Sequence, residues 1–358
     1  MNKITPLNRR ITAFVKLGKI FRSVAEKNPK LLPSDLLPFY DGLNTLVANE
    51  HLNNQWFIDK FIRFQLKAIA EVLTEKKITE WLTPYLPKLE QIKPINIGVV
   101  FAGNIPLVGF ADILAVLISG HNLIAKLSSK DQNLPKAVLN ILSSLESDFK
   151  NKIIIKEQKL NDYQAVIATG SNNTARYFKY YFRNVPHIIR TNKTSIAILN
   201  GFETDEQIKK LADDIMLYFG LGCRNVSKIF IPQNFDLNKI FKAIYHYAYV
   251  ADNSKYFNNY IYNRTIYLMN DYKFLDNGFF LMKEDTSFFS PVGVLFYEKY
   301  DNLEHLVKYL NNNSDKIQTI VSKIPSLPLK TVPYGKAQMP ELNDYADGID
   351  TMKFLLSL

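Results

Sequence analysis

The stretch from residue 95 to residue 201 alternates short apolar runs with longer amphipathic segments, and this alternation constrains the fold more than any other feature of the chain. INIGVVFAG (95–103) is a continuous apolar run that ends in glycine, which is typical of a strand buried in a parallel sheet. Further predicted strands are NLIAKLS, IIIKE, QAVIATG, IIRT and SIAILNG. Strands that alternate with helical segments of 12 to 15 residues indicate βαβ units and a parallel sheet.

Helices are expected between these strands, over about 106–119, 135–149 and 172–182. The first 90 residues are predicted to be mostly helical, because segments such as FIDKFIRFQLKAIAEVL have apolar residues at helical spacing. The N-terminal segment is basic and amphipathic, which favours a docked helix over a transient membrane contact. It has no long apolar run followed by a cleavage site, so no secretory signal is expected. No integral membrane span is expected either, because Gly103, Pro106 and Asp112 interrupt the longest apolar stretch.

The alternation resumes after Gly201. Thr204 is a candidate cap for a helix running to Phe219, and the turn GLGCRN then precedes the predicted strand VSKIFIP. A helix in DLNKIFKAIYHYAYVADNS and a strand in FFSPVGVLFYE follow. We therefore predict an N-terminal helical region over 1–90, a cofactor-binding domain over 91–199, a catalytic domain over 200–325 and a C-terminal segment over 326–358 that packs back on the cofactor domain or on a dimer partner.

The net charge of the chain indicates which partners it binds, and its cysteine content indicates the compartment in which it is found. The 358 residues carry a net charge of +10, which favours anionic partners such as nucleotides and coenzyme A. The charges are dispersed and no nucleic-acid motif accompanies them, so nucleic-acid binding is not expected. A single cysteine cannot form an internal disulfide, which indicates a reducing, cytoplasmic compartment. The five histidines are scattered without metal-ligand spacing, so no metal site is expected.

Polar turns follow three of the predicted strands. They are Ala102-Gly103-Asn104, Lys126 with the serines that follow it, and Thr169-Gly170-Ser171. Ligands of open parallel sheets bind at the carboxyl ends of the strands, so these turns indicate a dinucleotide site. The GxGxxG fingerprint is absent.

Cys223, the only cysteine, is predicted to lie in a turn between a helix and a strand. Gly220 and Gly222 give this turn a permissive backbone, and the neighbouring cations Arg224 and Lys228 are candidates to favour the thiolate. A buried cysteine in a strand would be a simple hydrophobic residue. The local sequence leaves a structural role and a nucleophilic role both open.

Four segments in order resemble the fatty acyl-CoA reductase (LuxC-type) branch of the aldehyde dehydrogenase superfamily. They are GVVFAGNIPLVGFADILAVLISGHNLIAKLSSKD, ATGSNNTARYF, GLGCRNVSKIFIP and VPYGKAQMPELNDYADGIDTMKFL. The resemblance implies an α/β fold with two Rossmann-like, three-layer αβα domains and an N-terminal helical region.

The resemblance also implies roles for individual residues. Cys223 would be the nucleophile, and the Asn104 amide would stabilise the oxyanion of the tetrahedral intermediate. Lys126 would hold the adenosine ribose, with Ser128 and Ser129 beside it. The Gly170-Ser171 turn would open a helix near the pyrophosphate.

Four positions depart from the family pattern. Ala175 stands where the family usually has a glycine four residues after the serine of the Gly-Ser turn. Ser129 stands where a glutamate often binds the ribose hydroxyls, which favours NADPH over NADH. Ser287 replaces the glutamate that binds the nicotinamide ribose. Arg190 stands where hydrolytic relatives carry a glutamate that activates water, and an arginine cannot serve as a general base. The acyl-enzyme is therefore expected to be reduced rather than hydrolysed.

These features predict an enzyme that reduces a long-chain fatty acyl-CoA or acyl-protein thioester to the aldehyde through an acyl-cysteine intermediate. The resemblance further implies a homo-oligomer, a dimer or tetramer, and an acyl-protein synthetase or transferase as a candidate partner. Two alternatives stay open: an NAD(P)-dependent aldehyde or semialdehyde dehydrogenase, and a catalytically silent scaffold of a lipid-synthesis complex.

Overall fold

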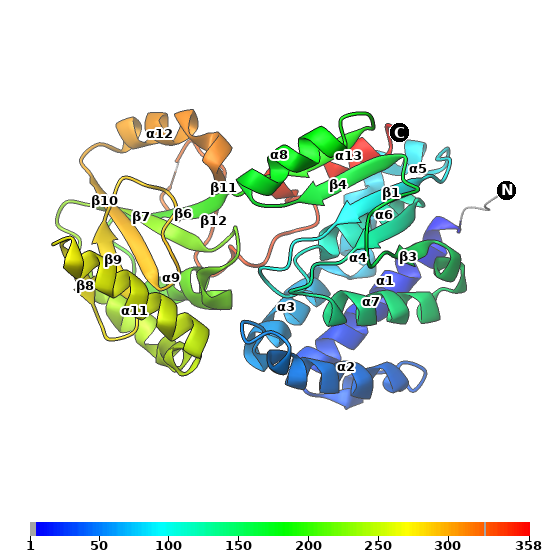
Figure 1. Ribbon diagram of the computed structural model, residues 1–358, viewed down its shortest axis with the longest axis horizontal. Helices are drawn as coiled ribbons and strands as arrows, with labels where there is room; N and C mark the ends of the chain where they lie inside the picture. Colours follow the sequence, from blue (N-terminus) through cyan, green and yellow to red (C-terminus); the bar gives the residue numbers. More distant parts are fainter. Residues whose placement is uncertain (1–4, 326) are drawn as a thin grey trace. The chain divides into compact units, whose positions relative to one another are not determined.

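A computed structural model describes residues 5–325 and 327–358. The chain divides into two compact units (Figure 1). Unit 1 runs to Thr191 and resumes at Glu341–Leu358, and unit 2 spans Asn192–Pro340. The sequence predicts domain boundaries after residues 199 and 325. Residue 326, the first of the predicted C-terminal segment, lies outside the described residues. The first division falls earlier because the strand that begins at Thr194 pairs within the sheet of unit 2.

Unit 1 contains a five-stranded parallel sheet in the order β3-β2-β1-β4-β5. Its strands are β1 Asn96–Val100, β2 Asn122–Lys126, β3 Ile153–Ile155, β4 Ala165–Thr169 and β5 His187–Arg190. The chain proceeds from β1 to β3 in one direction and from β4 to β5 in the other. The point where the strand order reverses therefore lies between β1 and β4.

Helices cover both faces of this sheet. They are α1 Leu7–Ala25, α2 Leu37–Asn49, α3 Asp59–Val72, α4 Glu75–Leu82, α5 Leu86–Leu89, α6 Phe110–Ser119, α7 Asn133–Leu145, α8 Asn172–Tyr181 and α13 Thr351–Leu355. Right-handed crossovers put α6 and α7 on one face and α8 on the other. The predicted N-terminal helix is confirmed as docked, because Phe14 and Phe21 of α1 are buried against Phe110 of α6.

Unit 2 contains a seven-stranded sheet in the order β12-β11-β6-β7-β10-β9-β8. Its strands are β6 Thr194–Ile198, β7 Val226–Pro232, β8 Phe274–Asp276, β9 Leu281–Glu284, β10 Val294–Tyr300, β11 Ile317–Val321 and β12 Thr331–Val332. The pairings are parallel except for β8 with β9. Its helices are α9 Asp205–Met216, α10 Asn238–Ile244, α11 Ser254–Met269 and α12 Leu303–Asn312.

The crossovers of unit 2 also put helices on both faces. The β6-to-β7 connection through α9 and the β10-to-β11 connection through α12 run in opposite directions across the sheet. Right-handed crossovers therefore place α9 and α12 on opposite faces. The predicted fold class of two three-layer αβα domains with an N-terminal helical region is confirmed.

Two helix boundaries differ from the sequence-based expectation. The helix predicted from Pro106 begins at Phe110, because 106–109 form turns in which Leu107 has a φ of 52°. The helix predicted to reach Phe219 ends at Met216, because Tyr218 and Phe219 adopt left-handed backbone angles. Both differences lie beside predicted site residues.

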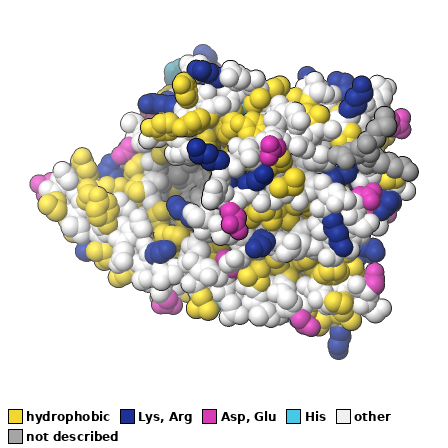
Figure 2. All heavy atoms as spheres, turned by 45° about the vertical axis from the view of Figure 1, so that its right-hand side comes forward, with side chains coloured by type: hydrophobic (Ala, Val, Ile, Leu, Met, Phe, Trp, Pro, Cys, Tyr) yellow, Lys and Arg dark blue, Asp and Glu magenta, His cyan; other side chains and the backbone are white. Residues whose placement is uncertain are grey.

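Basic side chains are spread over the face shown in Figure 2, interspersed with apolar and acidic ones. This agrees with the dispersed charge of the sequence. Within residues 5–325 and 327–358, each helix is too short or too polar to cross a bilayer.

Candidate active site

The predicted cofactor residues of unit 1 lie at the carboxyl edge of its sheet. Val100 of β1 pairs with Lys126 of β2 on one side and with Ala168 of β4 on the other. The turns that follow β1, β2 and β4 therefore emerge side by side at the point where the strand order reverses. Lys126 ends β2, and these turns carry Asn104, Ser128, Ser129, Gly170 and Ser171.

The Asn104 turn packs closely against the turn after β2. A Cβ atom at Gly103 would lie 2.5 Å from the Ser128 hydroxyl oxygen, so only glycine permits this approach without a shift. The Asn104 side chain is exposed, whereas Ile105 and Leu107 beneath it are buried. The buried apolar residues anchor the turn, and the Asn104 carboxamide faces solvent.

The turn after β2 carries the residues predicted to bind the adenosine ribose. Lys126 is partly buried, and its ammonium donates to the Glu157 carbonyl. Ser129 and Lys130 are exposed, and the Asn54 side chain of the N-terminal region donates to the Lys130 carbonyl over 2.9 Å. The exposed tip of this turn is thus fixed from below while its side chains face solvent.

Gly170-Ser171 opens α8 as the sequence predicts. The Ser171 hydroxyl caps the helix by accepting a hydrogen bond from the Thr174 amide over 3.2 Å. A Cβ atom at Gly170 would lie 3.0 Å from the Thr174 methyl carbon, so the glycine allows the turn to close onto the helix. The N-terminus of such a helix carries positive partial charge and favours phosphate.

Cys223 and Ser287 lie in unit 2, Cys223 just before β7 and Ser287 in the loop between β9 and β10. The Cys223 turn leads into β7 and the Ser287 loop leads towards β10, which pairs with β7. The Ser227 hydroxyl joins the two segments by donating to the Phe288 carbonyl over 2.6 Å. Cys223 and Ser287 are both exposed.

Asn225 holds the Cys223 turn in place. Its side-chain oxygen accepts from the Gly222 amide over 2.8 Å. Its amide nitrogen donates to the carbonyls of Asp214, Ile215 and Leu217, at 3.2, 3.2 and 2.8 Å, which satisfies backbone groups at the end of α9.

A second hydrogen bond holds the turn from the neighbouring strand, because the Ser195 hydroxyl donates to the Cys223 carbonyl over 3.0 Å. The backbone on both sides of the exposed thiol is therefore fixed.

The approach to this turn contains consecutive left-handed residues. Tyr218 and Phe219 have φ values of 54° and 58°, and Gly220 follows with 77°. Left-handed backbone is uncommon for residues other than glycine and costs about 1–3 kcal/mol at each such position. Both aromatic side chains are buried, and the Phe219 ring packs on Tyr256 at 5.7 Å between centroids. Burial of the rings offsets the backbone strain, and the chain is turned back to present Cys223.

Of the two cations expected near the thiol, Lys228 has a different role. Its side chain is fully buried, and its ammonium pairs with Glu298 at 2.5 Å and donates to the Thr286 carbonyl. Burial lowers the pKa of Lys228, and Glu298 opposes that effect. The Arg224 guanidinium donates to the Thr319 hydroxyl at 3.2 Å. The Lys228 ammonium is therefore engaged by Glu298 and Thr286 inside unit 2, and an effect of Lys228 on the thiolate stays a prediction.

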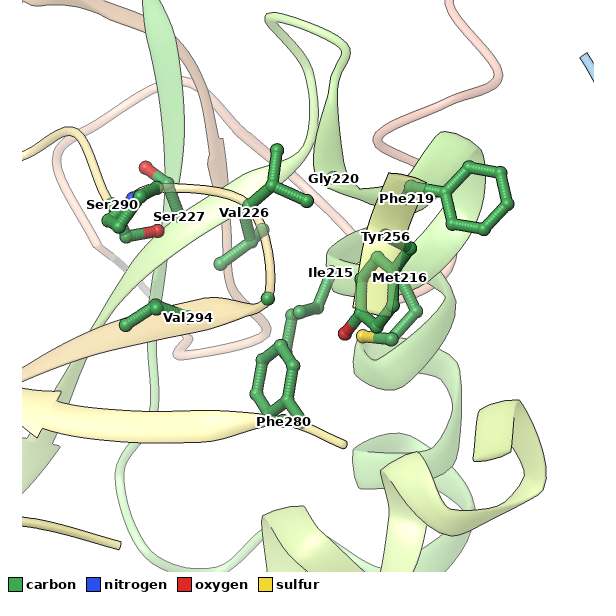
Figure 3. A pocket seen from close by; sticks show the side chains of 13 residues that line it. Ile215, Met216, Phe219, Gly220, Val226, Ser227, Tyr256, Phe280, Ser290 and Val294 are labelled. Carbon is green, nitrogen blue, oxygen red and sulfur yellow. The ribbon is translucent and has the colours of Figure 1, made fainter. Parts of the chain in front are cut away.

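A small cavity is lined by Gly220 and Val226, which flank the Cys223 turn in sequence (Figure 3). Its walls come from the end of α9, the start of β7, Tyr256, Phe280 and the loop before β10. Its volume of about 20 Å³ has room for one water molecule. It is therefore a packing gap within unit 2 and too small for an acyl chain.

Arg190 is held in a buried ion pair within unit 1. Its guanidinium forms two hydrogen bonds to the Asp112 carboxylate, at 2.6 and 2.8 Å, and one to the Thr351 hydroxyl at 3.0 Å. The arginine thus joins β5, α6 and α13. Replacing it by glutamate would place two carboxylates together in the interior, so this substitution tests folding before it tests hydrolysis.

Sequence reasoning missed the residues that support the site. Asn225, Ser195 and Asp131 are buried and make their contacts through short side-chain bonds to backbone. Asn225 stands within the quoted GLGCRN segment, and an asparagine just after a turn is a signal for side-chain-to-backbone bonding. Ser195 and Asp131 carry no such signal, because their partners are distant in sequence.

The fold and this arrangement of turns define the class of protein, and comparisons with solved structures agree. Aldehyde dehydrogenase 21 from Physcomitrella patens, determined with the reaction product succinate, is similar with a TM-score of 0.63 and 12% identity, over 96% of this chain and 84% of that chain. A NAD-dependent benzaldehyde dehydrogenase from Corynebacterium glutamicum gives 0.60 and 10%, over 90% and 77%. An indole-3-acetaldehyde dehydrogenase from P. syringae, determined with NAD⁺ and IAA, gives 0.59 and 11%, over 90% and 73%. The fold is that of the aldehyde dehydrogenases.

The family follows from the sequence. A profile of the acyl-CoA reductase (LuxC) family matches residues 40–243, which is more than half of the chain and includes Cys223. The chain belongs to this family and is an oxidoreductase that acts on aldehyde or acyl groups. Ser287 and the C-terminal segment lie outside the matched region. Comparison with curated protein sequences gave no match.

Proposed function

We propose that this protein reduces an acyl thioester, either a long-chain acyl-CoA or an acyl-protein, to the aldehyde with NADPH, through a covalent adduct on Cys223. The observation that carries the proposal is the exposed thiol of Cys223 on a turn fixed by Asn225 and Ser195. A reacting nucleophile needs an accessible sulfur in a defined position, whereas a structural cysteine is usually buried.

The residues of unit 1 fit a nicotinamide dinucleotide. The N-terminus of α8, with its serine cap and close glycine, suits the pyrophosphate. Lys126 ends β2 at the edge where an adenosine ribose would be bound, and Ser129 leaves space there for a 2′-phosphate. When bound, NADPH supplies the hydride.

The protein's own groups account for the remaining steps. The Cys223 thiolate attacks the thioester carbonyl, forming a carbon–sulfur bond and placing negative charge on the oxygen. The Asn104 amide and the Cys223 backbone N–H are the proposed donors to that oxygen. Collapse breaks the bond to the donor sulfur and expels a thiolate, which takes up a proton.

The acyl-cysteine is itself a thioester, and its carbonyl accepts the hydride. The carbon–Cys223 bond then breaks, the aldehyde leaves and the thiolate is restored. The sum is one acyl thioester, one NADPH and one proton converted to aldehyde, free thiol and NADP⁺.

Replacing Cys223 by alanine tests the proposal. Wild-type protein with a long-chain acyl-CoA and NADPH should produce aldehyde, and C223A should produce none above the uncatalysed rate. Without NADPH, wild-type protein should gain the mass of one acyl group, and C223A should gain no mass. Aldehyde production by C223A at the wild-type rate would rule out the covalent route.

Control measurements separate the alternatives. Wild-type protein that forms no adduct and no aldehyde with acyl-CoA or acyl-protein would favour a silent scaffold. Protein that oxidises aldehydes to acids and does not reduce thioesters would favour a dehydrogenase.

A further inference from the structure

The turn that carries Asn104 contains a strained backbone position. Leu107 has a φ of 52°, in the left-handed region that leucine rarely adopts. The turn is neither helix nor strand, so it lacks a regular ladder of backbone hydrogen bonds. A conformation of this kind persists only when its surroundings hold it.

Asp131 supplies that support from the neighbouring turn. One of its carboxylate oxygens accepts a hydrogen bond from the Leu107 amide over 2.8 Å. Its own amide donates to the Ser128 carbonyl over 3.0 Å, which closes the turn after β2. A Cβ atom at Gly103 would lie 3.2 Å from the Asp131 nitrogen. The Asp131 turn therefore touches the Asn104 turn on both sides of Asn104, at Gly103 and at Leu107.

This carboxyl group is costly to bury. Asp131 is 2% exposed, and its second oxygen, Oδ1, has no hydrogen-bond partner among the described residues. Burial raises the pKa of Asp131 to about 7, and the nearby Glu50 carboxylate adds to the effect. A buried carboxylate with an unsatisfied oxygen lowers stability. The contacts of Asp131 with the Leu107 amide and beside Gly103 therefore point to a role in fixing the Asn104 turn.

We propose that Asp131 is a positioning residue that fixes the Leu107 amide and thereby holds the Asn104 carboxamide where it can donate to the oxyanion. The inference rests on the proposed function, because it assigns Asn104 its role in that reaction. A catalytic donor displaced by about 1 Å can cost about 100-fold in rate. Loss of Asp131 should therefore reduce kcat, with little change in cofactor binding.

Four variants test this inference: D131A, D131N, N104A and the double variant. We expect D131A to lower kcat for acyl-CoA reduction by about 10- to 100-fold with the KM for NADPH within about threefold of wild type. D131N should retain most of kcat, because its side-chain oxygen can still accept from Leu107. The double variant should be no slower than N104A alone, because residues that act through one another are not additive.

Glu50→Ala is the matched control. Glu50 is also 2% exposed and accepts hydrogen bonds from Asn133 of α7, and within the described part of the chain it has no hydrogen bond to the Asn104 turn. E50A should lower the melting temperature and leave kcat of the folded protein unchanged. If D131A does not fold, Asp131→Ser serves in its place, since a shorter side chain cannot reach the Leu107 amide.

Amide hydrogen exchange gives a readout that does not depend on activity. Peptides spanning Leu107 should exchange faster in D131A than in wild type or E50A. This measurement keeps the inference distinguishable from the proposed function, which fails if wild-type protein forms no aldehyde. The inference is overturned by unchanged exchange at Leu107. It is also overturned by additive losses in the double variant, by a D131N variant as slow as D131A, or by a loss confined to the KM for NADPH.

Discussion

At the level of single residues, Ser129 is the side chain proposed to set the choice between NADPH and NADH. It lies beside Lys130 at the tip of the turn after β2, and both residues are exposed. A short neutral side chain leaves room for a 2′-phosphate, and a nearby ammonium attracts it. A carboxylate at the same place would repel the phosphate and bind ribose hydroxyls instead.

Replacing Ser129 by glutamate should therefore reverse the cofactor preference. We expect S129E to lower kcat/KM for NADPH by about 10-fold or more, equivalent to about 1.4 kcal/mol, while kcat/KM for NADH is maintained or raised. Steady-state kinetics with both cofactors measure this. Asn140→Glu, at an exposed position of α7, controls for the added negative charge. A wild-type preference for NADH, or an S129E variant that keeps its NADPH preference, would contradict the assignment.

Among the secondary-structure elements, the end of α9 and the segment after β12 are bonded to each other and to residues of the Cys223 turn. The Asp214 carboxylate at the end of α9 accepts from the Gly335 and Ala337 amides, at 2.6 and 2.9 Å. Arg224 reaches the Ala337 carbonyl at 3.5 Å. The VPYGKAQMP segment therefore supports the cysteine turn through backbone groups. This contact gives a physical reason why the segment resembles the family pattern.

The Asn225 side chain bonds to the Gly222 amide and to three carbonyls at the end of α9, so its removal should disorder the turn that carries the proposed nucleophile. N225A loses one acceptor and three donor contacts in a buried site, each worth about 1 kcal/mol or more. We expect kcat to fall by about 10-fold or more and the melting temperature to drop, while iodoacetamide still labels Cys223. Asn238→Ala, on the exposed side of α10, is the control and should behave as wild type. Full kcat in N225A would show that the turn holds its shape without this residue.

At the scale of the whole chain, unit 1 is completed by residues far apart in sequence. The returning segment from Glu341 contacts the N-terminal helices through Tyr345, whose hydroxyl accepts from the Trp81 ring nitrogen over 2.8 Å. His121 joins the last helix to the sheet. Its Nε2 bonds to the Leu355 carbonyl at 2.9 Å, and its Nδ1 accepts from the Ile95 amide at 3.2 Å.

This pair of bonds requires a neutral His121, which makes unit 1 sensitive to acid. Burial lowers the pKa of His121 below its ordinary value of about 6.5. The neutral His121 ring contributes fully to the stability of the folded state above about pH 6.5. This contribution is lost as the pH falls from that value through the lowered pKa of His121. Asp131 and Asp214 act oppositely, because burial raises the pKa of each to about 7, so their penalty disappears on acidification.

Comparison with His121→Gln isolates the histidine. From pH 7 to pH 4, wild type should lose more stability than H121Q, since both share the two aspartates. Chemical unfolding at each pH measures the difference, and hydrogen exchange of the 351–358 peptide locates it. His187→Gln, at an exposed position, should match wild type. An identical pH dependence in wild type and H121Q would contradict the assignment.

Local sequence patterns were enough to predict the strands, most helices and the turns that carry the candidate site. Buried parallel strands read as continuous apolar runs, and glycines mark the points where backbone must approach or reverse. INIGVVFAG, QAVIATG and GLGCRN therefore predicted β1, β4 and the Cys223 turn, and the polar residues after each strand predicted the edge on which Asn104, Lys126 and Ser171 lie.

The contacts of these residues depend on how the strands and helices pack, and local patterns did not predict them. Lys228 pairs with Glu298, Arg190 with Asp112, and Asp131 with the Leu107 amide, over separations of 24 to 78 residues. Such partners are chosen by strand order and helix packing, which local sequence does not encode. The same reason explains why the start of α6 and the end of α9 were misplaced. Left-handed backbone at Leu107, Tyr218 and Phe219 is sustained by burial and by distant hydrogen bonds, against the local preference of those residues.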